Sequence, residues 1–308
     1  MERREFLQQV AAWSVVAGTI PTLRIPSVSA QTTAPGVAAA QPELIVGKGK
    51  DYAELTRKVV EKLGGMQKFV KAGDKVVVKP NIGWDRTVEQ GANTHPEIVK
   101  ALVVMALAAG AKQVLVFDRS CDDTRKCYAK SGIKEAIEGL NDPRATCPYC
   151  DNAKFVPVKI DNGVAIQTWN IYKDALDADV YINVPIAKHH SSAKVTAGLK
   201  NIMGVAGGNR GSLHQNQGEK LTDLHLVIKP KLTIIDATRI LLRNGPQGGK
   251  MEDVKVLDTI VASTDPVAAD AYVTQWFDKK PDEIPIILAA SKRGLGEIDL
   301  AKVKVTEV

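Results

Sequence analysis

Residues 179–218 hold the densest group of side chains in the chain that could perform chemistry. Three of the five histidines, His189, His190 and His214, lie in this segment together with Lys188 and Arg210. Imidazole transfers protons near neutral pH and is also the commonest side-chain ligand of metal ions. We therefore predict that Lys188, His190 and His214 are the catalytic residues if the chain is an enzyme.

A divalent metal is one cofactor that these residues would suit. A catalytic metal needs three nitrogen or oxygen ligands and an open position. The predicted metal ligands are His189, His190 and His214, with Asp118 or Asp236 as the carboxylate. The histidines are not spaced four residues apart on one helix, and two histidines at a strand end also satisfy carbonyl groups and solvent without a metal. The cofactor is therefore left open at this point.

The glycine-rich residues 204–211 favour recognition of an acidic ligand. Glycine lets backbone N–H groups approach a ligand closely, and a guanidinium matches a carboxylate or phosphate with two parallel hydrogen bonds. Neither a Walker pattern nor a Gly-x-Gly-x-x-Gly fingerprint is present, which argues against a nucleotide. The alternative is that the glycines only make a tight exit from a helix. The predicted ligand-binding residues are Asn81, Asn201, Gly207, Gly208 and Arg210.

All four cysteines, Cys121, Cys127, Cys147 and Cys150, lie between two predicted strands. In an exported protein an even number of cysteines favours disulfides, with the local pairs 121–127 and 147–150 as the simplest connectivity. Two alternatives stay open. Cys147 and Cys150 have the spacing of metal ligands, and they could also form a redox-active dithiol.

Strands and helices alternate along the chain. Unbroken apolar runs predict buried strands at residues 75–83, 113–118 and 179–185, and further strands are predicted at 154–160, 231–237 and 255–263. Apolar residues at helical spacing predict helices at 51–65, 94–111, 131–140 and 265–277, with Thr94 and Asp265 as N-caps. This order indicates an α/β fold with a mostly parallel sheet and helices on both faces. Ligands of such sheets bind beyond the carboxyl ends of the strands, where Lys79, Asn81, Asp118 and Lys188 are predicted to lie.

The N-terminus has the form of an export signal. Arg3 and Arg4 precede a short apolar stretch, and small residues typical of a cleavage site follow up to Ala30. We predict a twin-arginine signal peptide at residues 1–30, a flexible linker at 31–45 and one α/β domain at 46–308. The expected location is the periplasm or another extracytoplasmic space, with the twin-arginine translocation machinery as a partner. No stable membrane span is expected in the mature chain, and the formal net charge of +6 is too evenly spread to indicate nucleic-acid binding.

Several motifs, in this order, resemble one known family. KPNIGWD is followed by NTHPEIVKALVVMALAAGAKQVLVFDRS, then by INVPIAKHHSSAKVTAGLKNIMGV, and then by KPKLTIIDATRILLRNGPQGG. From about residue 76 to residue 270 the chain resembles the bacterial and archaeal domain-of-unknown-function 362 family, which implies no established activity. Some members carry a ferredoxin-like segment, but this chain lacks its repeated, closely spaced cysteines, so an iron–sulfur cluster is a less favoured cofactor. A vaguer similarity links the chain to the lactate-racemase group.

Three classes of function remain compatible with these residues. The favoured class is an exported, metal- or cofactor-dependent enzyme that acts on a small acidic molecule. The second is a non-catalytic protein that binds an anion or a metal outside the cytoplasm. The third is a thiol redox or iron–sulfur protein that uses the cysteines.

Overall fold

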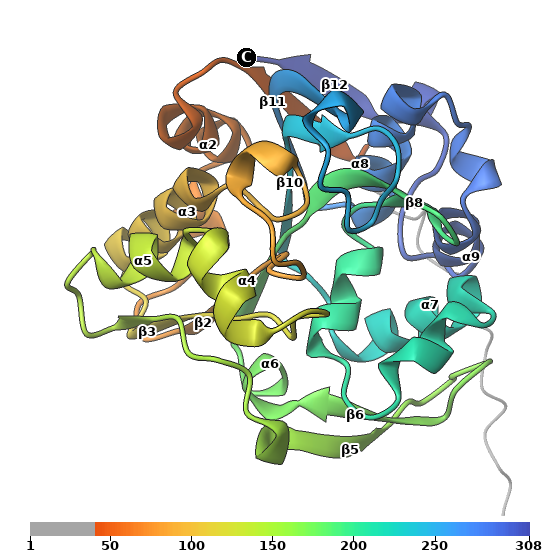
Figure 1. Cartoon of the computed structure of the whole chain (residues 1–308), viewed down its shortest axis with the longest axis horizontal. Helices are drawn as coiled ribbons and strands as arrows, with labels where there is room; N and C mark the ends of the chain where they lie inside the picture. The colour runs from red at the N-terminus through yellow and green to blue at the C-terminus, as the bar shows by residue number, and fades with distance from the viewer. Residues whose placement is uncertain (1–40) are drawn as a thin grey trace, which may run out of the picture. The chain divides into compact units, whose positions relative to one another are not determined.

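Residues 41–308, the part of the chain that the computed structural model describes, fold around a ten-stranded sheet (Figure 1). The strands are β1 (Glu43–Lys48), β2 (Lys75–Pro80), β3 (Gln113–Val116), β4 (Ala145–Thr146), β5 (Phe155–Lys159), β6 (Thr168–Tyr172), β7 (Val180–Val184), β8 (Ile186–His190), β9 (Lys194–Thr196), β10 (Leu232–Leu241), β11 (Val254–Ser263) and β12 (Lys304–Glu307). The order in the sheet is β12-β1-β11-β10-β7-β2-β3-β4, with β8 beside β10 and β9 beside β8. Most neighbours are parallel, whereas β11 runs antiparallel to β1 and β10, and β9 runs antiparallel to β8. The predicted α/β class with a mostly parallel sheet is confirmed.

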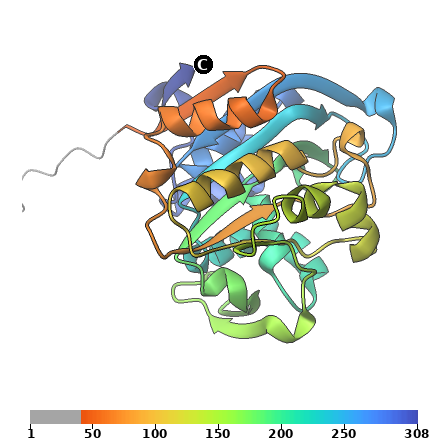
Figure 2. The ribbon, with the colours of Figure 1, turned by 90° about the vertical axis from the view of Figure 1, so that its left-hand side faces the viewer.

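Helices cover both faces of this sheet. They are α2 (Tyr52–Lys62), α3 (Pro96–Ala108), α4 (Thr124–Lys130), α5 (Ile133–Glu138), α6 (Lys173–Leu176), α7 (Gln217–Val227), α8 (Pro266–Val273) and α9 (Pro285–Lys292). Helices α2 and α3 lie side by side against one face, as Figure 2 shows. Val76 and Val78 of β2 pack on that side, while Val77 packs with Leu221 and Leu224 of α7 on the other. Successive side chains of a strand point to opposite faces, so a strand buried on both sides needs the unbroken valine run seen in the sequence.

The helix caps agree with the sequence at one site and differ at another. The Asp265 carboxylate accepts hydrogen bonds from the N–H groups of Val267 and Ala268 and caps α8, as predicted. Helix α3 is capped by His95, not by Thr94. The Thr94 hydroxyl instead donates to the carbonyl of Val184 at 2.7 Å and accepts from the N–H of Asn81 at 2.8 Å. It therefore ties the end of β2 to the end of β7.

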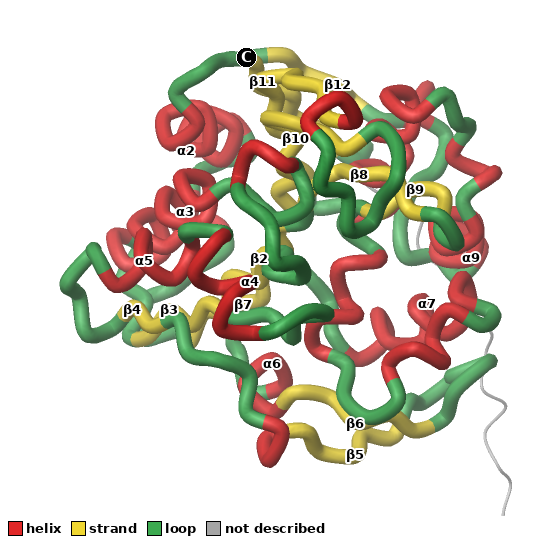
Figure 3. Tube along the Cα trace, viewed as in Figure 1, coloured by secondary structure: helices red, strands yellow, loops and turns green. Residues whose placement is uncertain are grey.

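Three predicted strands differ in length or place. Strand β10 extends well beyond residue 237, so that Asp236 lies within it and not at its end. Lys188 and His190 belong to a strand of their own, β8, because the chain continues extended after β7. Strand β5 pairs antiparallel with β6 in a separate two-stranded ribbon, which Figure 3 shows apart from the main sheet.

The predicted signal peptide at residues 1–30 lies outside the described residues, and so does most of the predicted linker. Strand β1 begins at Glu43, so the last residues of the predicted linker belong to the sheet. Within residues 41–308, no helix has both the length and the apolar character needed to cross a bilayer.

Candidate functional site

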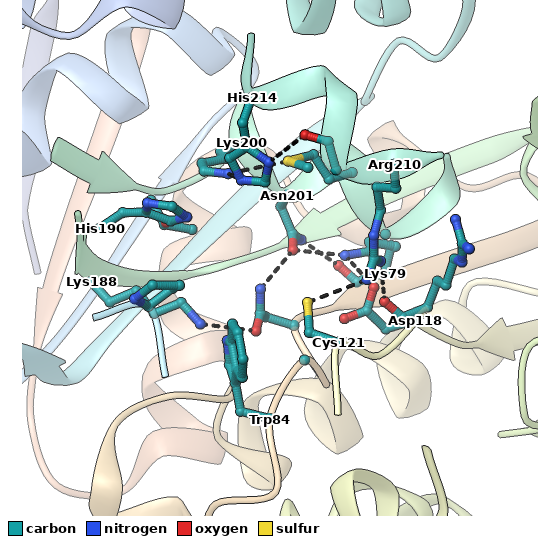
Figure 4. Close-up of a pocket in the computed structure, with 18 residues that line it drawn as sticks. Lys79, Trp84, Asp118, Cys121, Lys188, His190, Lys200, Asn201, Arg210 and His214 are labelled. Carbon is teal, nitrogen blue, oxygen red and sulfur yellow. Dashed lines mark hydrogen bonds and ion pairs between the residues drawn. The ribbon is translucent and has the colours of Figure 1, made fainter. Parts of the chain in front are cut away.

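A cavity of about 350 Å³ lies at the carboxyl ends of β2, β3 and β7, where β8 and the segment after β9 close over it (Figure 4). This is the edge at which parallel sheets bind ligands, and the volume suits a small molecule. Two short 3₁₀ helices, η5 (Lys200–Val205) and η6 (Arg210–His214), form part of its wall. The lining residues are Lys79, Asn81, Gly83, Trp84, Asp118, Arg119, Cys121, Lys188, His190, Thr196, Lys200, Asn201, Met203, Gly204, Arg210, Gly211, His214 and Pro246.

The cavity is strongly basic. Three lysines and two arginines line it, and Asp118 is the one carboxylate among the described residues of its wall. Asp118 is already engaged, because its Oδ1 lies 2.8 Å from Lys79 Nζ and both side chains are almost fully buried. The other basic groups of the wall have no carboxylate within ion-pair distance among the described residues, which creates a positive potential at the cavity.

The ion pair between Lys79 and Asp118 forms the floor of the cavity. Asp118 Oδ2 accepts a hydrogen bond from the N–H of Ile82 at 2.6 Å, and Lys79 Nζ donates to Asn201 Oδ1 at 2.7 Å. Burial lowers the pKa of Lys79, and the Asp118 carboxylate opposes that shift. Gly204 packs directly on the pair, so that a β-carbon at this position would overlap Asp118 Oδ1 and Lys79 Nζ. Position 204 therefore needs a glycine, because the Asp118 and Lys79 side chains lie too close for a β-carbon.

Lys188 lies on another side of the cavity, next to Trp84 (Figure 4). Its Nζ donates to the carbonyl of Ala92 at 2.6 Å and to Asn81 Oδ1 at 3.2 Å. In the described part of the chain, no carboxylate lies within ion-pair distance of this amine. Burial lowers the pKa of Lys188 to about 7, although Cys121 and Asp118 partly oppose the shift. A large fraction of Lys188 is therefore a neutral amine at physiological pH.

Lys200 and His214 form a second basic group. Lys200 Nζ lies 3.2 Å from His214 Nε2 and 3.1 Å from Met203 Sδ. His214 Nδ1 donates to the carbonyl of Gly211 at 3.2 Å, which leaves Nε2 to accept from the lysine. Burial lowers the pKa of Lys200 to about 8, and burial together with the Lys200 charge lowers the pKa of His214. The histidine is therefore neutral at physiological pH.

His190 is a neutral hydrogen-bond donor. Its Nδ1 accepts from the N–H groups of Ser192 at 3.2 Å and Ala193 at 3.3 Å, so its own proton sits on Nε2. Burial, helped by the charge of Lys200, lowers the pKa of His190 to about 2. The ring centre of His190 lies 5.5 Å from that of His214. The two histidines thus lie close together at the same cavity.

Two arginines hold the glycine-rich loop in place. Arg210 donates to the carbonyls of Arg119 and Ser120, and its Nη2 lies 3.3 Å from Cys121 Sγ. Arg119 donates in turn to the carbonyls of residues 206 and 208 and stacks its guanidinium over the ring of Phe155 at 5.3 Å. These contacts fix the loop after η5 against the loop after β3.

Not every residue predicted for the site reaches the cavity. Lys188, His190, His214, Asn81, Asn201, Arg210 and Asp118 line it, whereas Gly207, Gly208, His189 and Asp236 do not. The N–H of Gly207 donates to the carbonyl of Asn170 at 2.7 Å, so this glycine anchors the loop to the β5–β6 ribbon. Trp84, Thr196, Met203 and Pro246 line the cavity but were not predicted, because their residue types give no signal of chemistry in a sequence.

The predicted metal ligands do not converge. In the described residues no three histidine, cysteine, aspartate or glutamate side chains are placed to hold a metal ion. His189 points to the opposite side of β8 from His190, and its Nδ1 accepts from the N–H of Gly245 at 3.1 Å. Asp236 accepts from both the N–H and the hydroxyl of Thr238, and Asp118 is held by its lysine.

The cysteines also differ from the prediction. All four lie in the described part of the chain, and all four are free thiols. Cys121 lines the cavity, Cys127 and Cys147 are buried in the core on the α3 side, and Cys150 packs in the core on the other face. The predicted pairs 121–127 and 147–150 therefore face different surroundings. Burial raises the pKa of Cys127 to about 11 and that of Cys147 and Cys150 to about 12. These three thiols are protonated at neutral pH, which does not suit a redox dithiol.

Comparison with known proteins assigns the family. The sequence pattern of the domain of unknown function DUF362 matches residues 76–275, a range that contains every lining residue of the cavity. The chain belongs to the DUF362 family. The chain is also similar to a thylakoid-associated protein of Synechocystis sp. The two are 30% identical over 251 residues, which cover 78% of this chain and 74% of that protein.

Two solved structures are also similar to this DUF362 member. The lactate racemase apoprotein from Thermoanaerobacterium thermosaccharolyticum aligns with a TM-score of 0.49 and 12% identity over 72% of this chain. A protein from Thermotoga maritima aligns with a TM-score of 0.44 and 13% identity over 80% of this chain. The aligned part spans only 54% of the racemase and 60% of the second protein.

Proposed function

We propose that this DUF362 member is an enzyme that acts on a small organic anion, with the basic cavity as its active site. The observation that carries the proposal is the imbalance of basic and acidic groups: five basic side chains line the cavity with one carboxylate, which is bound to Lys79. A buried cation without a counter-charge, as at Lys200, is costly, and an anionic ligand would remove that cost.

Lys200 is the residue best suited to bind the anion. Its side chain is more than nine-tenths buried, and in residues 41–308 it has no carboxylate within ion-pair distance. A bound carboxylate would favour the charged form of this amine, so binding would be accompanied by proton uptake near neutral pH. The side-chain amides of Asn81 and Asn201 add neutral hydrogen-bonding groups to the same wall.

Proton transfer is the chemistry that the cavity supports. The Lys188 amine has a pKa of about 7, which is close to the optimum for a general base at physiological pH. The Nε2–H of His190 is a neutral donor from the same strand. Figure 4 shows both side chains on the same side of the cavity. A base and a hydrogen-bond donor beside an anion-binding pocket suit removal or addition of a proton on the bound ligand.

Isothermal titration with small anions tests the binding part of this proposal. Malonate and phosphate are the probes, and neutral malonamide is the matched control ligand. The variant Lys200→Gln should weaken anion binding by about tenfold or more, since a charge-assisted hydrogen bond contributes about 1.5–3 kcal/mol. Lys112→Gln is the control. Lys112 is exposed and directly precedes β3, at the opposite end of that strand from the cavity, so this variant should bind the anion as the wild type does. Equal affinity in Lys200→Gln and the wild type would refute the assignment.

Export through the twin-arginine pathway is part of the proposal. It is supported by Arg3 and Arg4 in the N-terminal sequence, and the Synechocystis relative is described as thylakoid-associated. Replacing both arginines by lysine should retain the full-length chain in the cytoplasm, as measured by cell fractionation. Periplasmic recovery of the double variant at the wild-type level would contradict export by this route.

A further inference from the structure

We propose that Lys188 is a covalent nucleophile, whose amine condenses with the carbonyl carbon of a small oxo acid bound in the cavity to form an imine. The ligand class is an organic acid that also carries a ketone or aldehyde group. This inference rests on the proposed function, because it needs an organic anion in the same cavity.

The hydrogen bonds of Lys188 match a neutral amine. An ammonium group has three N–H donors, whereas a neutral amine has two donors and one lone pair. Lys188 Nζ has two oxygen acceptors, the carbonyl of Ala92 at 2.6 Å and Asn81 Oδ1 at 3.2 Å. A neutral amine satisfies both and keeps its lone pair for a carbonyl carbon in the cavity.

Asn81 is oriented to serve as one of these acceptors. Its Nδ2 donates to Asn201 Oδ1 at 3.4 Å, which leaves Oδ1 directed to Lys188. Asn201 is itself fixed, since its Nδ2 donates to Asn183 Oδ1 at 2.8 Å and to the carbonyl of Lys79 at 3.1 Å. An asparagine at position 81 thus holds the amine without giving it a negative partner, as an aspartate would.

The other lysines of the cavity are less suited to nucleophilic attack. Lys79 Nζ is occupied by an ion pair with Asp118 Oδ1 at 2.8 Å and by a hydrogen bond to Asn201 Oδ1. Lys200 contacts His214 Nε2, an acceptor, and Met203 Sδ, a weak one, and its pKa is about 8. Lys188 is the more buried of these two, and its amine is held by two oxygen acceptors, the carbonyl of Ala92 and Asn81 Oδ1.

The reaction balances with the groups present. Attack of the amine forms a C–N bond and converts the carbonyl into a hydroxyl group, and loss of water then forms the C=N bond. The two protons of the amine leave in that water, so no oxidant, reductant or co-reactant is needed. The neutral His190 can donate a hydrogen bond from its Nε2–H to the carbonyl oxygen as that oxygen becomes a hydroxyl group, while both protons of the amine pass to this oxygen. Lys188 and His190 are two residues apart in β8, so their side chains lie on the same face of the strand.

Reductive trapping tests the inference. The full chain is incubated with pyruvate or glyoxylate, treated with borohydride and analysed by mass spectrometry of its peptides. We expect one reduced adduct at Lys188, formed about tenfold or more faster than at exposed lysines such as Lys112, and slowed by an excess of malonate. An adduct at Lys200 or at exposed lysines alone, or no adduct, would overturn the inference.

Variants separate this inference from the proposed function. Lys188→Met should lose the adduct, and Lys112→Met should keep it. If Lys188→Met does not fold, protection of the wild-type Lys188 peptide by malonate gives the same answer. Malonate binding without any adduct would refute the imine and leave the anion site standing, whereas failure of every probe anion to bind would refute the proposed function itself.

Discussion

Replacing Lys188 by methionine tests whether the fold holds this amine near neutrality. The pKa of Lys188 is about 7 in the folded chain, against 10.5 for an ordinary lysine. At pH values between about 7 and 10.5, the Lys188 amine is protonated in the unfolded chain and largely neutral in the folded chain. The free energy of unfolding of the wild type therefore rises with pH in this window, and the stabilising effect is lost as the pH falls toward 7. Lys188→Met lacks this titration.

The size of the effect follows from one proton. A difference of one bound proton changes the free energy of unfolding by about 1.4 kcal/mol per pH unit. From about pH 7.5 to about pH 9.5, the wild type should therefore gain about 2.5 kcal/mol relative to Lys188→Met. All other titrating groups are common to both chains and largely cancel in the difference.

Urea unfolding at the two pH values, followed by circular dichroism, measures this difference. Lys112→Met is the control, because its side chain is exposed and its removal should leave the pH dependence unchanged. Parallel stability curves for the wild type and Lys188→Met would refute the reasoning. They would show that the amine keeps an ordinary pKa, and the general-base role would then fail as well.

Three further predictions follow from buried contacts. Gly204→Ala should displace the ion pair between Lys79 and Asp118, because the new β-carbon has no room. We expect weaker anion binding and a free energy of unfolding lower by about 2 kcal/mol or more. An unchanged melting temperature and an unchanged anion affinity would contradict the geometry. The buried Asp223 carboxylate accepts hydrogen bonds from three backbone N–H groups and pairs with Arg293 at 3.0 Å. Asp223→Ala should therefore lower the free energy of unfolding by about 3 kcal/mol, as measured with a denaturant. A loss under about 1 kcal/mol would show that these bonds contribute little. A thiol reagent in denaturant without reductant should count all four cysteines as free, and a count of two or none would restore the disulfide prediction.

The sequence determined most of the fold for a simple physical reason. A strand buried on both faces needs apolar residues along its length, and residues 76–78 and 180–182 have them. Helix periodicity in residues 52–62 and the cap at Asp265 are equally local signals. Polar residues at strand ends also pointed to the correct edge of the sheet, since parallel strands end at the same edge. Lys188, His190 and His214 could be named as cavity residues on these grounds.

Only the tertiary structure decided which polar groups meet and which are already satisfied. His189 and His190 are neighbours in sequence, yet they lie on opposite faces of β8 because side chains alternate along a strand. Asp118 looked like a free metal ligand until Lys79, from another strand, proved to neutralise it. The properties of Lys188 depend on Ala92 and Asn81, which lie about a hundred residues earlier in the chain.

Residues 179–218 therefore define the chemistry only in combination with the loops after β2 and β3. The sequence shows which side chains are present, because residue type fixes donors, acceptors and charge. It does not show burial or long-range partners, and these are what shift a pKa and decide whether a lysine is an ammonium or a free amine. That physical difference is why the sequence left both a metal and an acidic ligand open, whereas in residues 41–308 the predicted metal ligands do not converge.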